Sequence, residues 1–111
     1  MAMKAKVFCE ELVHKVPLLA GLLKEHLEDY DELLTHVFMS EVSRYVISHR
    51  EGRKQIGEFL DECFRDYGDD IQNLIAVSFV ENLVSEDEFE RALDGASADA
   101  LRKEWQQQRE A

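Results

Sequence analysis

The chain has 111 residues, of which 45% are hydrophobic, with Gly 5 and Pro 1. This composition supports a packed core and excludes a disordered, collagen-like or low-complexity chain, and the length allows one domain. Thirteen Lys and Arg face 24 Asp and Glu, and the formal net charge of −11 argues against binding to nucleic acid or an anionic membrane, because both repel an acidic surface.

Targeting signals and disulfide patterns are absent from the sequence. Its two cysteines, Cys9 and Cys63, form no CxxC pair and are too few for a small secreted domain stapled by disulfides. Glu10 and Glu11 interrupt the N-terminal region too early for a signal peptide. The longest uninterrupted apolar run, residues 17–23, is far too short to span a membrane. We therefore expect a cytoplasmic protein.

Two helices are predicted in the N-terminal part of the chain. The first covers residues 4–15. Pro17 suits the first turn of the second helix, which we expect to end near Glu28. We place His26 near solvent because it follows an acidic residue, and we expect Asp31 to cap the next helix. Five leucines mark the expected buried side of the second helix: Leu18, Leu19, Leu22, Leu23 and Leu27.

Two further helices are predicted in the middle of the chain. Residues 33–49 carry apolar side chains at helical spacing, as one long helix or two short ones, and residues 49–52 form a loop. The next helix is the clearest, and Gly68 is expected to end it. Its apolar residues recur at i, i+3, i+4, i+7, i+8 and i+11: Ile56, Phe59, Leu60, Cys63, Phe64 and Tyr67.

Residues 69–84 predict the central helix of the fold. Asp69 with Gln72 three residues later is a capping-box pattern. The apolar side chains that follow cover almost the whole circumference, which is typical of a helix buried on most sides. We therefore expect the other helices to pack against residues 70–84.

Two short helices are predicted at the C-terminal end. Ser85 with Glu88 forms a second capping-box pattern, Ser97 begins the last helix, and the polar tail 106–111 is expected to fray. No stretch alternates apolar and polar residues between turn signals, so we expect no sheet. The sequence predicts one all-α domain, a compact orthogonal array of six or seven helices with a central buried helix near 70–84.

Motifs for catalysis are mostly absent. The sequence has no nucleotide-binding glycine loop, no serine-hydrolase elbow and no HExxH. Glu11 and His14 have the Glu-x-x-His spacing of metal ligands in di-iron bundles, but a second copy of the pair is missing. We therefore expect no metal, no cofactor and no enzymatic activity. The alternative is a small metal-dependent enzyme that uses Glu11, His14 and His36.

Three polar residues beside apolar stretches are candidates for a binding surface. His36 either packs its ring partly inside, with one nitrogen bonded to a backbone carbonyl, or contacts a partner. Glu81 and Asn82 fall within the most apolar helix, where buried polar groups need partners. They either bond structural groups, such as a helix end, Arg44 or loop backbone, or line a groove that receives a partner.

Acidic residues gather in three runs along the chain. These runs are Glu25, Glu28, Asp29, Asp31 and Glu32; Asp61, Glu62, Asp66, Asp69 and Asp70; and Glu86, Asp87, Glu88 and Glu90. A charge run is commonly a solvated face, but a net charge of −11 exceeds the magnitude of about 2 to 8 that keeps a small domain soluble. The excess would speed capture of a basic protein and would imitate nucleic-acid phosphate.

Two stretches of the sequence resemble a known family. The first, within residues 18–45, contains EHLEDY, LLTHVFM and a later RY, and the second, residues 69–83, reads DDIQNLIAVSFVENL. They resemble a family of small, acidic, all-helical bacterial proteins without an assigned activity, similar to immunity proteins of polymorphic-toxin and contact-dependent inhibition systems. The resemblance covers roughly residues 10–90. It implies a protein that binds and neutralises a cognate toxin, frequently a cationic nuclease.

The expected function is therefore non-catalytic protein binding, in the form of an immunity protein that neutralises a cognate basic toxin. The alternative is a regulatory or scaffolding helical module of a larger assembly, which would use an apolar helix face. Neither nucleic acid nor membrane is an expected partner, and we expect a monomer or weak dimer. The residues expected to contact the partner are Glu28, Asp29, Asp31, Glu32, His36, Asp69, Asp70, Glu81, Asn82, Glu86, Asp87 and Glu88.

Overall fold

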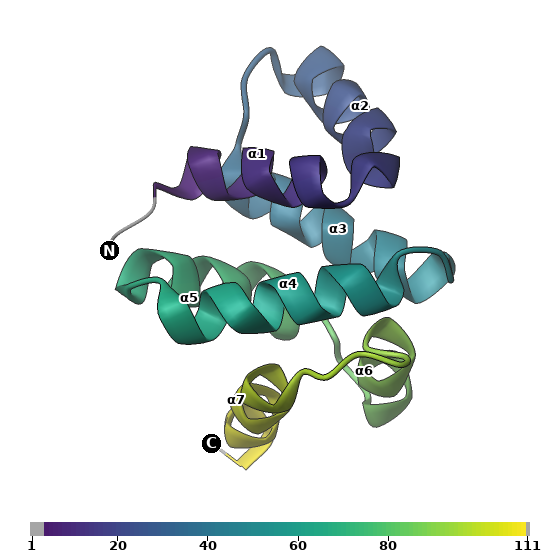
Figure 1. Ribbon diagram of the computed structural model, residues 1–111, viewed down its shortest axis with the longest axis vertical. Helices are drawn as coiled ribbons and strands as arrows, with labels where there is room; N and C mark the ends of the chain where they lie inside the picture. The colour runs from purple at the N-terminus through teal and green to yellow at the C-terminus, as the bar shows by residue number, and fades with distance from the viewer. Residues whose placement is uncertain (1–3, 111) are drawn as a thin grey trace.

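The computed structural model describes residues 4–110, whose regular structure is entirely helical (Figure 1). This confirms the predicted all-α array. The Cα radius of gyration is 12.9 Å, and no helix among these residues is both long and apolar enough to cross a bilayer. The elements are α1 (Ala5–Lys15), the 3₁₀ turn η1 (Pro17–Leu19), α2 (Ala20–Tyr30), α3 (Thr35–Ser48), α4 (Arg53–Asp66), α5 (Asp69–Ile75), the π-helical turn η2 (Ala76–Val80), α6 (Glu86–Ala92) and α7 (Asp99–Glu110).

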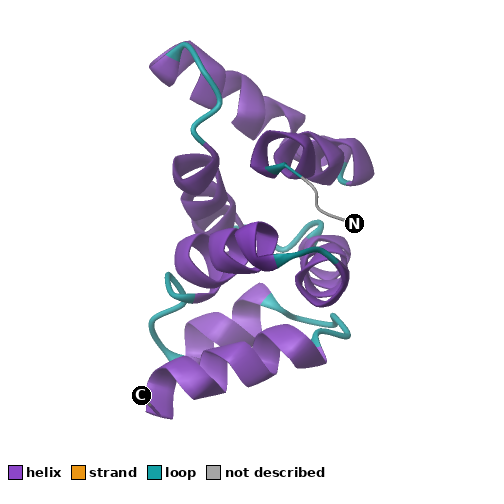
Figure 2. Cartoon of the chain, turned by 90° about the vertical axis from the view of Figure 1, so that its left-hand side faces the viewer, coloured by secondary structure: helices purple, strands orange, loops and turns teal. Residues whose placement is uncertain are grey.

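The core is organised around α5 and η2. As predicted, this segment is central, and η2 packs most extensively against α3. It is not buried all round, however, because Val77 is 45% exposed. In Figure 2, α2 lies at the upper end of the molecule and the C-terminus at the opposite end. The largest fully buried side chains are Phe8, Phe38, Phe79, Phe89, Leu12, Leu19, Met39, Ile56, Leu60, Ile71, Leu74 and Ile75.

The central helix ends in a π turn. The N–H of Glu81 donates to the carbonyl of Ala76 at 2.9 Å, a bond that spans five residues instead of four. The side chain of Asn82 donates to the carbonyl of Ser78 at 2.8 Å. Glu81 and Asn82 are exposed in the turn that follows η2. The prediction that both lie within the apolar helix is therefore wrong.

The predicted N-cap of α6 is confirmed. The N–H of Glu88 donates to Oγ of Ser85 at 3.1 Å. In return, Oε1 of Glu88 accepts the N–H of Val84 at 3.1 Å, one residue earlier than in a standard capping box. These two bonds satisfy backbone donors at the start of a short helix, which explains why α6 begins there.

The start of α5 differs from the prediction. Gly68 precedes the first residue of α5 rather than ending α4 in a left-handed conformation, and no side chain caps α5. The predicted capping box of Asp69 is therefore wrong. Gln72 instead donates from Nε2 to the carbonyl of Phe64 at 2.9 Å, which ties α5 to the end of α4.

The last helix is longer and better anchored than predicted. It begins at Asp99 rather than Ser97 and continues to the end of the described residues. Nε1 of Trp105 donates to the carbonyl of Leu83 at 2.8 Å. Within the tail, Nε2 of Gln108 donates to the carbonyl of Ala76 at 3.2 Å. These bonds oppose the predicted fraying of residues 106–110, and residue 111 lies outside the described part.

The buried side of α2 is also different from the prediction. Leu18 and Leu27 are 38% and 41% exposed, whereas His26, which we expected near solvent, is 1% exposed. Asp31 does not cap α3, because Leu34 precedes that helix and makes no side-chain cap. Asp31 instead ends α2 in a left-handed conformation, with φ 62°. α2 therefore has one buried side chain and a largely open apolar side.

Both cysteines are buried, free thiols, as the apolar helical pattern predicted for Cys63. Burial raises the pKa of each thiol from 9.0 to about 12, and carboxylates on nearby residues add to the effect. We expect Ellman's reagent to leave Cys9 and Cys63 unmodified in the folded protein at about pH 8 and to modify both in about 6 M guanidinium chloride. Rapid modification of either thiol in the folded protein would contradict this packing.

The same shifts set the sign of a pH effect on stability. Unfolded thiols ionise near pH 9.0, whereas the folded thiols stay neutral to about pH 12. The contribution of the neutral thiols to stability is therefore complete below about pH 9 and is lost as the pH rises towards 12.

Candidate functional site

A single buried histidine fixes α2 to the rest of the fold. Nδ1 of His26 lies 2.8 Å from Oε1 of Glu41 on α3, and Nε2 accepts the backbone N–H of Leu34 at 3.0 Å. Because Nε2 accepts a hydrogen bond, we assign the ring hydrogen to Nδ1, which donates it to the carboxylate. The ring edge also meets Phe38, with 5.6 Å between ring centroids. His26 thus connects α2 to the residue that precedes α3 and to the middle of α3.

Four exposed carboxylates crowd the end of α2 and the loop that follows it. They are Glu28, Asp29, Asp31 and Glu32. None of them takes part in an ion pair with another residue of the described chain, 4–110. The backbone dipole makes a helix C-terminus partly negative, so acidic groups here are unfavourable by about 0.3–1 kcal/mol each. These carboxylates therefore have no stabilising role in α2.

Five residues of the other two acidic runs lie at the opposite kind of helix end. Asp69 and Asp70 occupy the first turn of α5, and three acidic residues occupy the first turn of α6. Negative charge stabilises a helix N-terminus. Within α6, Glu88 caps the helix and Asp87 pairs with Arg91 at 2.6 Å. These five residues thus have a structural explanation that the carboxylates at the end of α2 lack, whereas Asp66, the exposed last residue of α4, shares the situation at the end of α2 as a single charge.

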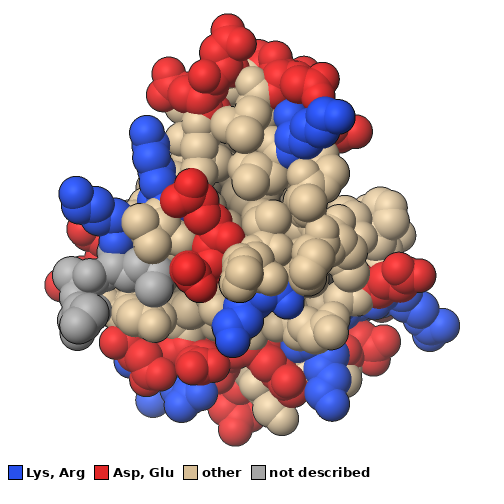
Figure 3. Space-filling view, turned by 45° about the horizontal axis from the view of Figure 1, so that its top comes forward, with Lys and Arg blue, Asp and Glu red and all other residues tan. Residues whose placement is uncertain are grey.

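Apolar side chains border the carboxylates of α2. Leu27 is 41% exposed and Tyr30 is 44% exposed, and the ring of Tyr30 lies 4.9 Å from that of His26. Figure 3 shows carboxylates gathered at the top of the view, with uncharged side chains directly below them. Protein interfaces combine a few apolar or aromatic anchors with a charged rim. We name the surface formed by Leu27, Tyr30 and the four carboxylates the α2 surface.

Asp31 offers a direct test of whether the acidic residues serve stability. A left-handed residue at a helix C-terminus is most easily glycine, and an aspartate there costs about 0.5–1 kcal/mol more. We expect Asp31→Gly to raise the free energy of unfolding by about that amount in urea denaturation. The matched control Asp29→Gly removes the same charge inside α2 and should lower it by about 1 kcal/mol. Equal destabilisation by both variants would contradict the assigned backbone conformation.

A hydrogen-bond network joins α3 to the π turn. Nδ1 of His36 lies 2.5 Å from Oγ of Ser78, and Asn82 donates to Oγ of Ser40 at 3.0 Å as well as to the carbonyl of Ser78. His36 itself is exposed and bonds a hydroxyl, so the predicted bond to a backbone carbonyl is wrong. The structure thus brings His36 and Asn82 together. Glu81 makes no bond in this network.

The pairing of His36 with Ser78 places a nucleophile and a base within hydrogen-bond reach. Sequence spacing could not pair them, because the two residues are 42 positions apart. Ser78 is only 3% exposed, however, so a substrate cannot reach its oxygen without opening the α3–η2 interface. We interpret this network as a structural clamp. Among residues 4–110, no three His, Cys, Asp or Glu side chains are grouped so that they could hold a metal ion.

One known family matches nearly the whole chain, including the residues of the α2 surface. The sequence model of the family described as "Domain of unknown function (DUF7674)" matches residues 9–111. The chain belongs to this family. No curated protein and no solved structure matches it. The DUF7674 match includes both the α2 surface and the His36–Ser78 network.

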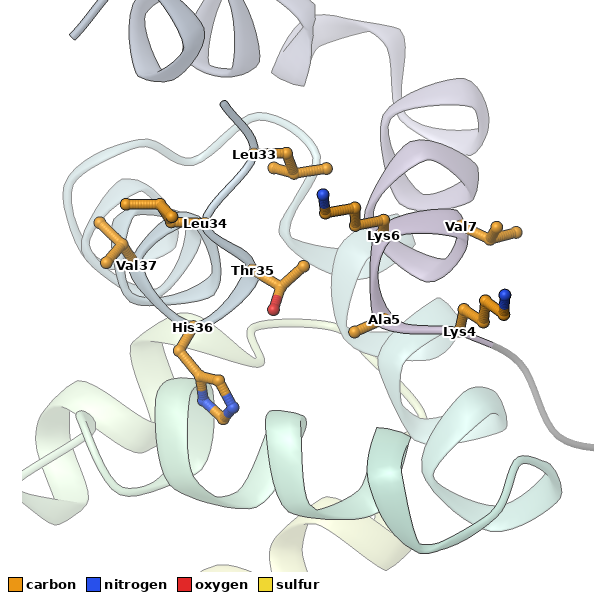
Figure 4. A pocket seen from close by; sticks show the side chains of 9 residues that line it. All are labelled: Lys4, Ala5, Lys6, Val7, Leu33, Leu34, Thr35, His36 and Val37. Atoms are coloured by element: carbon orange, nitrogen blue, oxygen red, sulfur yellow. The ribbon is translucent and has the colours of Figure 1, made fainter. Parts of the chain in front are cut away.

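A hollow in this DUF7674 chain lies between the starts of α1 and α3 (Figure 4) and has a volume of about 570 Å³. Lys6 reaches towards Leu33 across it, whereas His36 points away from it towards η2. No carboxylate lines this hollow, so it does not suit a basic partner. Its lining residues are Lys4, Ala5, Lys6, Val7, Leu33, Leu34, Thr35, His36 and Val37.

Proposed function

We propose that this DUF7674 protein is a non-catalytic protein-binding protein that captures a basic partner at the α2 surface, in the role of an immunity protein against a cognate toxin. The observation that carries the proposal is the position of the four carboxylates. They lie at the helix end where they oppose stability, they have no described ion pair, and they border exposed Leu27 and Tyr30. Residues that oppose local stability are most often kept for function.

The physical roles of the two kinds of side chain differ. The carboxylates raise the rate of encounter with a basic protein and select against acidic ones. Exposed Leu27 and Tyr30 supply apolar area, which contributes most of the binding free energy in protein interfaces. The net charge of −11 extends the attraction beyond the contact surface. A cationic nuclease fits this chemistry, because its active surface already binds a polyanion.

Co-expression with the neighbouring upstream reading frame tests the immunity role. The product of that frame is expressed in a sensitive host with and without the DUF7674 protein, and the pair is then co-purified. The proposal predicts that growth is restored and that the two proteins form a complex. A toxic neighbour that is neither bound nor neutralised would contradict the immunity role.

The second candidate is a regulatory or scaffolding module of a larger assembly. The observation in its favour is the apolar hollow between α1 and α3, which could receive an apolar segment of another subunit. Such a module would associate independently of the carboxylates on α2. Loss of partner binding on substitution of Leu33 or Val37, without loss on neutralising the α2 carboxylates, would favour this candidate.

A further inference from the structure

A groove runs along the open side of α2. Val13 of α1 forms one wall, and the volume of the groove is about 430 Å³. The residues that α2 contributes fall at i, i+3, i+4, i+7 and i+8, which is one continuous stripe along the helix. They are Ala20, Leu23, Lys24, Leu27 and Glu28. The groove thus follows α2 for most of its length, about 12 Å at 1.5 Å per residue.

The groove is mainly apolar, with Lys24 midway along its rim and an acidic residue at one end. Leu23 is half-buried against the core and Leu27 is 41% exposed, so both leave apolar surface open to the groove. At the C-terminal end of the stripe, Glu28 lines the groove itself, and the remaining carboxylates of the α2 surface follow in the chain. The partial negative charge of the helix end adds to theirs. An occupant therefore needs apolar side chains along about two helical turns and positive charge at one end.

We propose that this groove receives a short amphipathic helix of the basic partner, with its apolar face against Leu23 and Leu27 and its lysines or arginines against the carboxylates at the end of α2. The proposal rests on the proposed function and adds the form of the recognised segment. A helix laid in an apolar groove makes contacts at i, i+3, i+4 and i+7, the same spacing that the stripe on α2 presents.

Two synthetic probes test the proposal with the complete protein. The first is a dye-labelled helical peptide of about 16 residues, with leucines at i, i+3, i+4 and i+7 and four lysines at one end. The second keeps the lysines and replaces the leucines with glutamine. Fluorescence anisotropy at low salt should give at least about ten-fold tighter binding for the leucine peptide. Leu27→Gln should abolish this difference, and the control Val84→Gln, at a residue 63% exposed and outside the groove, should preserve it.

The possible results distinguish a failure of the groove proposal from a failure of the proposed function. If the protein binds the two peptides with equal affinity, and Leu27→Gln does not change either affinity, the proposal that the groove receives an amphipathic helix is overturned. Electrostatic capture of a basic partner would remain. If neither peptide binds the wild-type protein at concentrations up to about 1 mM, the groove proposal is also overturned. The co-expression assay, which does not depend on these peptides, decides the proposed function separately.

Discussion

Replacing His26 with leucine is expected to lower the free energy of unfolding by about 2–4 kcal/mol. The substitution keeps a buried side chain of similar size but removes the hydrogen bonds to Glu41 and to the N–H of Leu34. A buried donor or acceptor left without a partner costs about 1–3 kcal/mol, and more when it is charged. Urea denaturation followed by circular dichroism measures the change.

The matched control for this variant is His49→Leu. His49 is exposed and stacks on Tyr45 at 4.3 Å between ring centroids, so its loss should cost less than about 1 kcal/mol. Hydrogen exchange adds a local measurement, since the amides of α2 should exchange faster in His26→Leu than in the control. Equal stability of the two variants would contradict the role of His26 in holding α2.

Neutralising the carboxylates on α2 is expected to separate binding from stability. The variant Glu28→Gln, Asp29→Asn, Asp31→Asn, Glu32→Gln should bind the basic partner about 10- to 100-fold more weakly, chiefly through slower association. Its free energy of unfolding should rise by about 1–4 kcal/mol, because each of the four charges opposes the helix dipole by about 0.3–1 kcal/mol. Biolayer interferometry and urea denaturation measure the two quantities.

The control variant removes four charges from the other acidic segments. Asp69→Asn, Asp70→Asn, Glu86→Gln, Asp87→Asn has the same net charge as the α2 variant, so long-range attraction is equal in the two. These residues lie in the first turns of α5 and α6, and their neutralisation should lower the free energy of unfolding by about 1–2 kcal/mol. Partner binding should be nearly unchanged. Weaker binding in the control than in the α2 variant would place the interface elsewhere.

Local signals in the sequence predicted much of the fold. The apolar stripe that begins at Ile56 lies in α4 up to Phe64, Tyr67 follows the helix end, and Ser85 caps α6. The π turn at η2 could not be predicted, because its widened hydrogen bonds depend on packing against α3 rather than on local propensity. The C-terminal tail was judged by its polarity alone. Gln108 in this tail donates to the carbonyl of Ala76, which is 32 residues earlier in the sequence.

The burial of His26 could have been predicted from the helical periodicity of the apolar residues before it. His26 continues the stripe of Leu19, Leu22 and Leu23 at i+7 from Leu19, a position that faces the core on an amphipathic helix. The acidic residue before it points to another face of the helix and carries no information about burial. Periodicity is therefore a better guide to this histidine than the charge of its neighbour.

The candidate surface was predicted only in part. The sequence identified three acidic segments, but it placed the end of α2 near Glu28 and made Asp31 the cap of α3, where its charge would be favourable. In the structure α2 continues to Tyr30, so the same carboxylates lie at an unfavourable helix end. Helix boundaries carry an uncertainty of about two residues in sequence analysis, and here that difference decides which segment lacks a structural role.

The most direct measurement for the account is the salt dependence of association with the basic partner. The account predicts that the association rate constant of the wild-type protein falls at least about ten-fold as sodium chloride rises from about 50 to about 500 mM, and that the α2 variant loses most of this dependence. An association rate that is independent of salt, or a dependence that the α2 variant retains in full, would contradict capture by the carboxylates on α2.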